Sequence, residues 1–268
     1  MDAKLVTLRA MARDEASKGE MAIDQAVYEA LGRDPLEPLI GGGNECAPVG
    51  FFGRDPGREE VRWMEPLIGS AGKLVRAGVH RWVRGSAPAD FDDERQMSSE
   101  VFFSNTVPYK PLGNKAWSMA VKRRFHTVIA SYLVDHWTGH DLITLGNVAF
   151  HWFAIGADRD ARAKMKAFWS REDRYEASYD VELKSPLTTQ SKSLRLHPLP
   201  HPSPPYFDLE HEPRLRRIAS EELVPTHGCI WHPHHEGGLI ANQCLVKAPG
   251  ANDPLRLEPT PQPLYLLL

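Results

Sequence analysis

Three polar side chains of different chemistry, Asp55, Asn105 and His201, each follow a short apolar run in the sequence. The run before Asp55 covers residues 49–52 and ends at a glycine, and His201 stands between two prolines. Apolar runs of this length are typical of buried strands, and open α/β sheets place their ligand sites at the carboxyl ends of parallel strands. The spacing therefore predicts that a carboxylate, an amide and an imidazole converge on one crevice. Taken alone, the stretch around Asp55 also fits a surface turn with a solvated carboxylate.

The elements that must position these side chains alternate along the chain. Helices are expected at residues 3–17, 22–31, 69–83, 118–137, 147–153, 156–172 and 210–223. Strands are expected at residues 49–53, 101–105, 142–145 and 194–199, with a further strand or hairpin arm at 175–183. Residues 41–43 are predicted to be a flexible link and residues 58–64 a polar loop. Alternating strands and helices predict an α/β fold, a three-layer α/β/α sandwich around a central, mainly parallel four-stranded sheet.

Three regions are expected along the chain. Residues 1–45 form an N-terminal helical extension, residues 46–223 the α/β/α domain, and residues 224–268 a tail rich in proline and histidine that packs on or beside the domain. The tail contains a cluster of histidines around Cys229, but its spacing matches no standard zinc finger. We therefore expect no metal.

The composition is that of an ordinary globular protein, with 268 residues, of which 42% are hydrophobic and 25% charged. The first residues lack the apolar core of a signal peptide, and no run reaches the length of a membrane helix. A cytoplasmic monomer is expected. The three cysteines, Cys46, Cys229 and Cys244, are too few for a disulfide framework and form no C-x-x-C motif.

The charge distribution leaves two interpretations open. A net charge of −3 and a pI near 6.5 argue mildly against nucleic-acid binding. Residues 101–124, however, contain no acidic residue and five basic ones: Lys110, Lys115, Lys122, Arg123 and Arg124. This basic run is either a phosphate-facing patch or the solvated face of a helix.

Together, the motifs resemble those of the uracil-DNA glycosylase superfamily. Residues 53–57, Asn105 and residues 201–204 are similar to its three motifs, in the same order. Residues 65–74 resemble the segment that leads into its first helix, and residues 143–149 its third strand and following turn. Each motif is weak alone, whereas five in order are a specific signal.

The resemblance implies catalytic roles for Asp55 and His201. Asp55 would stabilise the sugar cation and orient the attacking water, and His201 would donate a hydrogen bond to the leaving base. His197 is the competing histidine, but only His201 is followed by Pro-Ser-Pro. The four-cysteine families have their acid one position earlier, where this chain has Arg54.

The resemblance also implies a base-binding set made of Gly53, Gly57, Asn105 and Leu67. The Asn105 amide can both donate to and accept from a uracil edge. Gly57 stands where strict uracil enzymes carry a tyrosine that excludes the methyl group of thymine, so a broader base range is expected. Leu67 stands where several relatives carry a stacking aromatic residue, although Phe51, Phe52 or Trp63 are alternatives.

DNA contacts are expected from Ser70, Lys110 and Ser203, which would bind phosphates. Tyr206 and Phe207 would either insert into the base stack or pack their own loop.

Two features of relatives are not expected here. The iron–sulfur cluster of some families needs four cysteines, and Tyr109 occupies the place of one of them. Residues 122–126 resemble a basic loop whose histidine captures DNA covalently in one relative. In this chain they fall within a helical pattern, so we interpret the match as coincidence.

The resulting expectation is a monofunctional DNA glycosylase that flips uracil, and other deaminated or modified bases, out of single- or double-stranded DNA. It would hydrolyse the N-glycosidic bond without a cofactor, release free uracil and start base excision repair. The alternative is a protein of the same fold that binds uracil or abasic DNA without turnover. An unrelated hydrolase using Asp55, His201 and Ser203 ranks last, because the chain has no G-x-S-x-G elbow.

Overall fold

The computed structural model describes residues 3–202, which belong to the first of two units, Met1–Val224 and Pro225–Leu268. The helix expected at residues 210–223 and the tail cluster around Cys229 lie outside the described residues.

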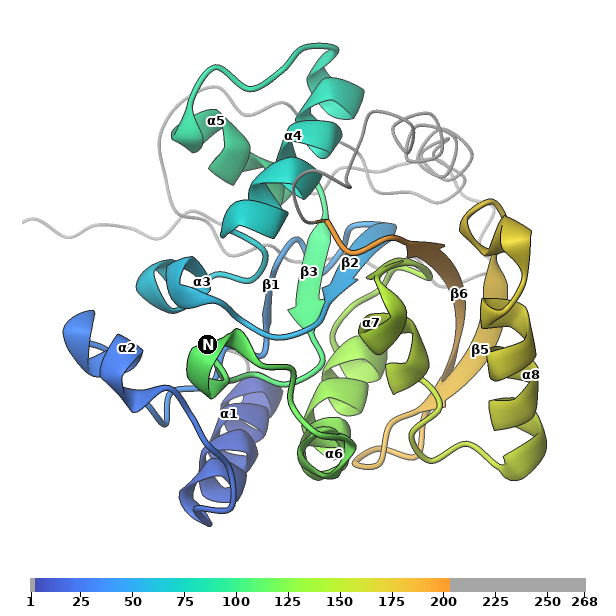
Figure 1. The fold of residues 1–268 in the computed structure, drawn as a ribbon, viewed down its shortest axis with the longest axis horizontal. Helices are drawn as coiled ribbons and strands as arrows, with labels where there is room; N and C mark the ends of the chain where they lie inside the picture. Colours follow the sequence, from blue (N-terminus) through green and yellow to red (C-terminus); the bar gives the residue numbers. More distant parts are fainter. Residues whose placement is uncertain (1–2, 203–268) are drawn as a thin grey trace, which may run out of the picture. The chain divides into compact units, whose positions relative to one another are not determined.

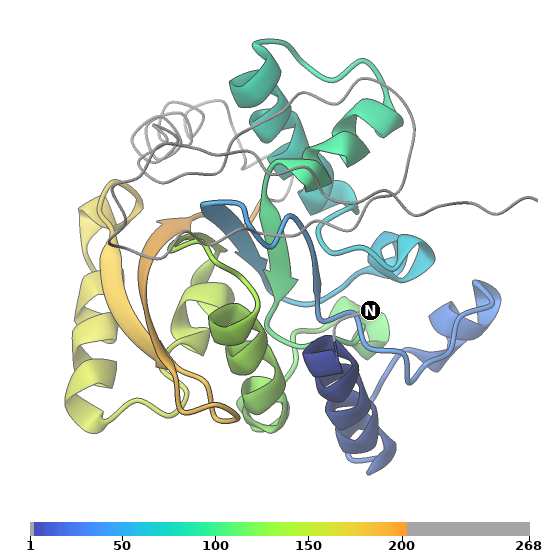
Figure 2. The same ribbon diagram turned by 180° about the vertical axis from the view of Figure 1, so that it is seen from behind.

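The described residues contain a six-stranded sheet in the order β1-β3-β2-β4-β6-β5 (Figures 1 and 2). Its strands are β1 (Gly41–Gly43), β2 (Val49–Gly53), β3 (Phe102–Asn105), β4 (Asp141–Leu145), β5 (Tyr179–Lys184) and β6 (Ser191–Leu199). The four central strands run parallel, while β1 and β5 pair antiparallel at the two edges. The predicted α/β fold with a mainly parallel sheet is confirmed, and the sheet has two more strands than expected.

The extra strand β1 corrects the expectation of a flexible link at residues 41–43. A Cβ on Gly41 would lie 2.1 Å from Tyr132 Cε1, and Gly43 has a φ of 83°. The glycines are therefore required by close packing and by a left-handed backbone conformation, not by mobility.

The helices form two layers around the sheet (Figures 1 and 2). They are α1 (Ala3–Ser17), α2 (Gln25–Ala30), α3 (Arg58–Trp63), α4 (Ser70–Arg84), α5 (Phe91–Gln96), α6 (Met119–Asp135), α7 (Asn147–Trp152) and α8 (Arg159–Trp169). Short 3₁₀ turns cover Met97–Ser99, Leu112–Asn114 and Glu172–Tyr175. Helix α3 replaces the polar loop expected at residues 58–64, and α5 has no counterpart in the expectation.

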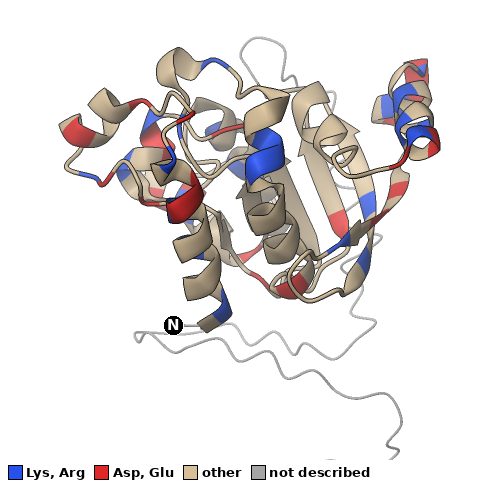
Figure 3. Cartoon of the chain, turned by 90° about the horizontal axis from the view of Figure 1, so that it is seen from below, with Lys and Arg blue, Asp and Glu red and all other residues tan. Residues whose placement is uncertain are grey.

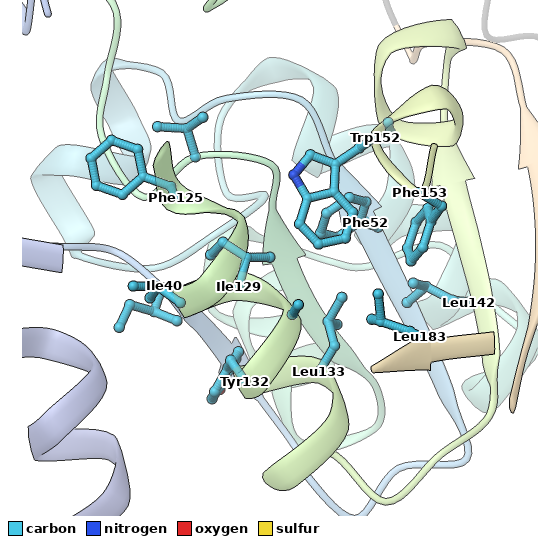
Figure 4. Packing of buried hydrophobic residues seen from close by; sticks show 14 of the residues in the cluster. Ile40, Phe52, Phe125, Ile129, Tyr132, Leu133, Leu142, Trp152, Phe153 and Leu183 are labelled. Atoms are coloured by element: carbon cyan, nitrogen blue, oxygen red, sulfur yellow. The ribbon is translucent and has the colours of Figure 1, made fainter. Parts of the chain in front are cut away.

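The alternation of side chains along β2 divides the core in two. Phe51 packs against Phe103, 5.8 Å between ring centroids, in the cluster that includes Val75 and Val79 of α4. Phe52 faces the opposite layer and lies beside Trp152 and Phe153 at the C-terminal end of α7, with ring centroids 5.1 and 5.3 Å away (Figure 4). Because the strand is buried on both faces, its sequence reads as a continuous apolar run.

His126 lies on α6, at the end of the segment that resembles the covalent loop of a relative. Its ring packs on Trp152 with centroids 4.7 Å apart, and its Nε2 has no hydrogen-bond partner among residues 3–202. Burial lowers the pKa of His126 to about 4. The folded protein therefore holds this imidazole neutral.

The first prediction follows from the pKa of His126. Protonation is disfavoured in the folded state, so this group should remove up to about 3 kcal/mol of unfolding free energy as the pH falls from 6.5 to 4. His126→Gln should flatten that loss in urea titrations, whereas the exposed control His140→Gln should not. Equal pH slopes in wild type and His126→Gln would contradict the assignment.

Candidate active site

The C-terminal ends of β2 and β3 lie side by side and place two of the predicted site residues together. Gly53 pairs with Asn105 in the parallel register, and the Thr106 amide donates to the carbonyl oxygens of Gly53 and Arg54 at 3.1 and 3.0 Å. The loop that carries Asp55 is thus fastened to the segment that follows Asn105.

Asp55 is a buried carboxylate with weak hydrogen bonds. Its side chain is 1% exposed, and Oδ2 accepts from the Trp117 amide at 3.4 Å. Oδ1 lies 3.2 Å from Thr106 Oγ1, whose single hydroxyl proton is shared with a closer acceptor, the Arg54 carbonyl oxygen. Arg54 Nε lies 3.3 Å from Oδ2 as an ion pair without hydrogen-bond geometry. Burial raises the pKa of Asp55, opposed by the charges of Arg54 and Lys122 and by the two hydrogen bonds. The site therefore holds a carboxylate whose charge is poorly solvated.

Lys122 belongs to the basic run of the sequence, and in the fold its charge acts on Asp55. Its ammonium is buried and donates to the Trp117 carbonyl oxygen, while the Trp117 indole donates to the Tyr109 carbonyl oxygen at 2.8 Å. Burial lowers the pKa of Lys122, against the attraction of Asp55. The spacing to Phe125 and Ile129, three and seven residues on, puts Lys122 on the apolar face of its helix and was the signal for its burial.

Asn105 ends β3 with a buried side-chain amide. The residue is 2% exposed, and its Nδ2 has no hydrogen-bond partner within the described part of the chain. A Cβ on Gly53 would lie 2.7 Å from Asn105 Oδ1 and 3.1 Å from Leu67 Cδ2. Gly53, Asn105 and Leu67 are therefore neighbours, and a buried donor without a partner marks a place where a ligand acceptor fits.

Leu67 belongs to a strained segment, residues 64–69, which we call the wall segment. Met64 and Leu67 have φ values of 49° and 51°, a region that costs non-glycine residues about 1–3 kcal/mol. The buried guanidinium of Arg76 holds the segment, since its Nε donates to the Leu67 carbonyl oxygen at 2.6 Å and its Nη2 to that of Pro66 at 3.0 Å. Strain of this kind persists only where the surroundings impose it.

The alternatives to Leu67 as a residue against the base differ in their surroundings. Phe51 and Phe52 are buried in the two core clusters. Trp63 is exposed at the end of α3 and packs on Phe91, with Arg95 over its ring at 4.7 Å. Leu67 is the candidate whose side chain lies against both Gly53 and the neighbourhood of Asn105.

His201 follows β6 and approaches the turn after β4. A Cβ on Gly146, whose φ is 86°, would lie 3.1 Å from His201 Cβ, so this glycine permits both the turn and the close approach. Partial desolvation, followed by the charge of Arg54, lowers the pKa of His201, although the residue is exposed at the surface. Arg54 therefore acts electrostatically on both Asp55 and His201.

His197 has a different environment. Its Nε2 lies 2.7 Å from Asp141 Oδ1, at the first residue of β4, and Arg195 lies 3.7 Å from the same oxygen. This buried pair joins two strands at the end of β4 away from Gly146, and it fits a structural role.

The predicted DNA-binding residues lie in different environments. Ser70 is exposed as the first residue of α4, whose N-terminal amides have no side-chain cap. Lys110 is a correction: it is 3% exposed and its ammonium lies 2.7 Å from Asp24 Oδ2, so it faces the protein and not a phosphate. Ser203, Tyr206 and Phe207 lie outside the described residues.

The basic run does not form a patch either. Besides Lys110 and Lys122, Arg124 is engaged, in an ion pair with Glu15 of α1. Lys115 and Arg123 remain exposed. Figure 3 shows a basic band on α6 and mixed charges on α8, not a broad positive face.

Within residues 3–202 no cluster of three or more histidine, cysteine, aspartate or glutamate side chains is arranged to hold a metal ion. The helices of this part include none long and apolar enough to cross a membrane.

No curated protein shows significant similarity to the chain. The family model of the Uracil DNA glycosylase superfamily matches residues 40–220. This range contains β2, which Asp55 follows, and β3, which ends at Asn105. The chain belongs to the uracil-DNA glycosylase superfamily.

Proposed function

We propose that this protein is a monofunctional DNA glycosylase that flips uracil out of DNA and hydrolyses its N-glycosidic bond. The observation that carries the proposal is the pair of neighbouring strand ends. They bring Asn105, whose buried Nδ2 has no hydrogen-bond partner among residues 3–202, beside the loop of a buried carboxylate, Asp55. An enzyme that acts on a flipped base needs both a group that reads the base and a group that responds to the sugar.

Asp55 would act on the sugar. Cleavage of the glycosidic bond develops positive charge on the sugar ring, and a fixed carboxylate stabilises that charge more strongly when little water competes. The hydrogen bonds from Thr106 and Trp117 orient the carboxylate, and its raised pKa suits it to take a proton from the attacking water.

Asn105 and His201 would act on the base. The Nδ2–H of Asn105, which has no partner within the described residues, can donate to a carbonyl oxygen of uracil while Oδ1 accepts from the ring N–H. The lowered pKa of His201 keeps its imidazole neutral near pH 7, and a neutral ring donates one N–H to the oxygen on which the leaving base carries its charge.

We further propose that the enzyme works as a monomer without a cofactor, on single- or double-stranded DNA. Ser70, the exposed first residue of α4, is the predicted phosphate contact that lies at the surface of the described residues. Burial of Lys110 and Lys122 reduces the basic surface with which the alternative, a binding protein without turnover, would hold DNA.

One assay separates the two functions. The protein is incubated with an oligonucleotide that contains one uracil and then treated with alkali. Strand cleavage at the uracil indicates excision. A heat-stable adduct, or binding without cleavage, would favour the alternative.

The second prediction concerns Asp55. Asp55→Asn removes the charge but preserves the shape, so single-turnover excision should slow by at least about a hundredfold. Affinity for uracil-containing DNA should change little, because the side chain is buried and contacts no phosphate in this proposal. Near-wild-type rates, with the variant shown to be folded, would remove Asp55 from the mechanism.

The third prediction separates the two histidines. His201→Ala should lose most of the activity at unchanged stability. His197→Ala leaves Asp141 without its main partner and should lower the unfolding free energy by about 1–3 kcal/mol while retaining activity per folded molecule. The reverse pattern would show that His197 is the catalytic histidine.

A further inference from the structure

We propose that Glu60 is a positioning residue that joins the Asp55 loop to the wall segment and thereby sets which bases the site accepts. This inference rests on the proposed function, because it concerns the same base-binding site.

The Glu60 carboxylate links two backbone segments through three hydrogen bonds, which we call the Glu60 bridge. Oε2 accepts from the Gly57 amide at 2.9 Å, and Oε1 accepts from the amides of Ile68 and Gly69 at 3.2 and 2.8 Å. Gly57 ends the turn that follows Asp55, and Ile68 follows Leu67. One side chain, 8% exposed, thus fixes the distance between the loop of the catalytic acid and the wall.

Gly57 and Gly69, the two glycines of the Glu60 bridge, both pack against the Glu60 carboxylate. A Cβ on Gly57 would lie 2.7 Å from Glu60 Oε2, and a Cβ on Gly69 would lie 2.9 Å from each oxygen. Neither glycine needs its conformational freedom, because their φ values are −98° and −73°. Space for Glu60 is therefore the reason for glycine at these positions.

The contact between Gly57 and Glu60 changes the role that we assign to Gly57. The sequence suggested that its missing side chain leaves room beside the base. The structure fills the space next to Gly57 with the Glu60 carboxylate. The residue that limits the room beside the base is accordingly Leu67, the part of the wall segment that adjoins Gly53 and Asn105.

Leu67 depends on supports on both sides. Arg76 holds its carbonyl oxygen, and the Glu60 bridge holds the two amides that follow it. Since Leu67 has a strained left-handed conformation, loss of one support allows the backbone to relax. The Leu67 side chain would then shift relative to Asn105 and alter the room available for a substituent on the base.

Glu60 is not positioned to act as a base itself. Its two oxygens receive three amide hydrogens, so both are occupied in orienting backbone. A carboxylate of this kind acts through the residues that it holds.

The test begins with Glu60→Gln, which keeps the shape but replaces one acceptor oxygen by a donor. We expect kcat/KM for uracil in DNA to fall about ten- to a hundredfold, the scale of an ångström-sized misplacement. The preference for uracil over 5-hydroxymethyluracil should shrink at least about tenfold, within the range that one pocket contact controls. The control Glu59→Gln lies on the same helix in a surface pair with Arg62 and should leave both values unchanged.

A second variant tests the same bridge without touching Glu60. Gly57→Ala puts a methyl group against Oε2 on a backbone that alanine adopts without strain. It should reproduce the loss of selectivity, and the double variant Gly57→Ala/Glu60→Gln should be no worse than the more impaired single variant. Multiplying effects, or unchanged selectivity in both single variants, would overturn the proposal.

A measurement that needs no turnover completes the test. Hydrogen exchange at the amides of Gly57, Ile68 and Gly69 should accelerate at least about tenfold in Glu60→Gln, relative to Glu59→Gln. Unchanged exchange at these three amides would refute the bridge even if activity fell. If the wild type excised no uracil, the proposed function would fail, while the exchange rates would still decide whether Glu60 positions the wall segment.

Discussion

Keeping the Asp55 carboxylate out of water is the constraint on which the rest of the site depends. A buried charge is costly unless protein groups replace its solvent. Here the replacement comes from Thr106 after β3, the Trp117 amide before α6, and the charges of Arg54 and Lys122. Each of these groups belongs to a different segment. The carboxylate therefore requires the sheet, the loop after β3 and α6 to be in place together.

Much of the fold could be predicted because it depends on local pattern. The central parallel strands are short apolar runs, and α6 has a clear helical period, so both are visible in the sequence. The strand ends then bring Gly53 and Asn105 together by register alone. The interactions that determine these elements are between residues close in sequence, or they follow from the geometry of parallel sheets.

The parts that the sequence did not predict depend on partners distant in the chain. Helix α3 has few apolar residues, and Glu60 gains its role only from amides that the fold brings to it. Lys110 looks like a surface cation until Asp24, far away in sequence, is seen beside it. The periodicity of apolar residues along the sequence carries no information about contacts between such distant residues. The family resemblance suggested base-binding positions such as Leu67 and Gly57. Only the three-dimensional structure shows which groups surround them.

The ion pair between Asp24 and Lys110 affects where the chain can be truncated without destabilising the fold. The family match starts at residue 40, which suggests a minimal domain without α1 and α2. Such a fragment would lose Asp24 as the counter-charge of a buried ammonium, and it would uncover the part of α6 that Leu8 and Ala12 help to enclose. The range of a family match is therefore a poor guide to where this chain can be shortened, because buried partners of the matched region lie before residue 40.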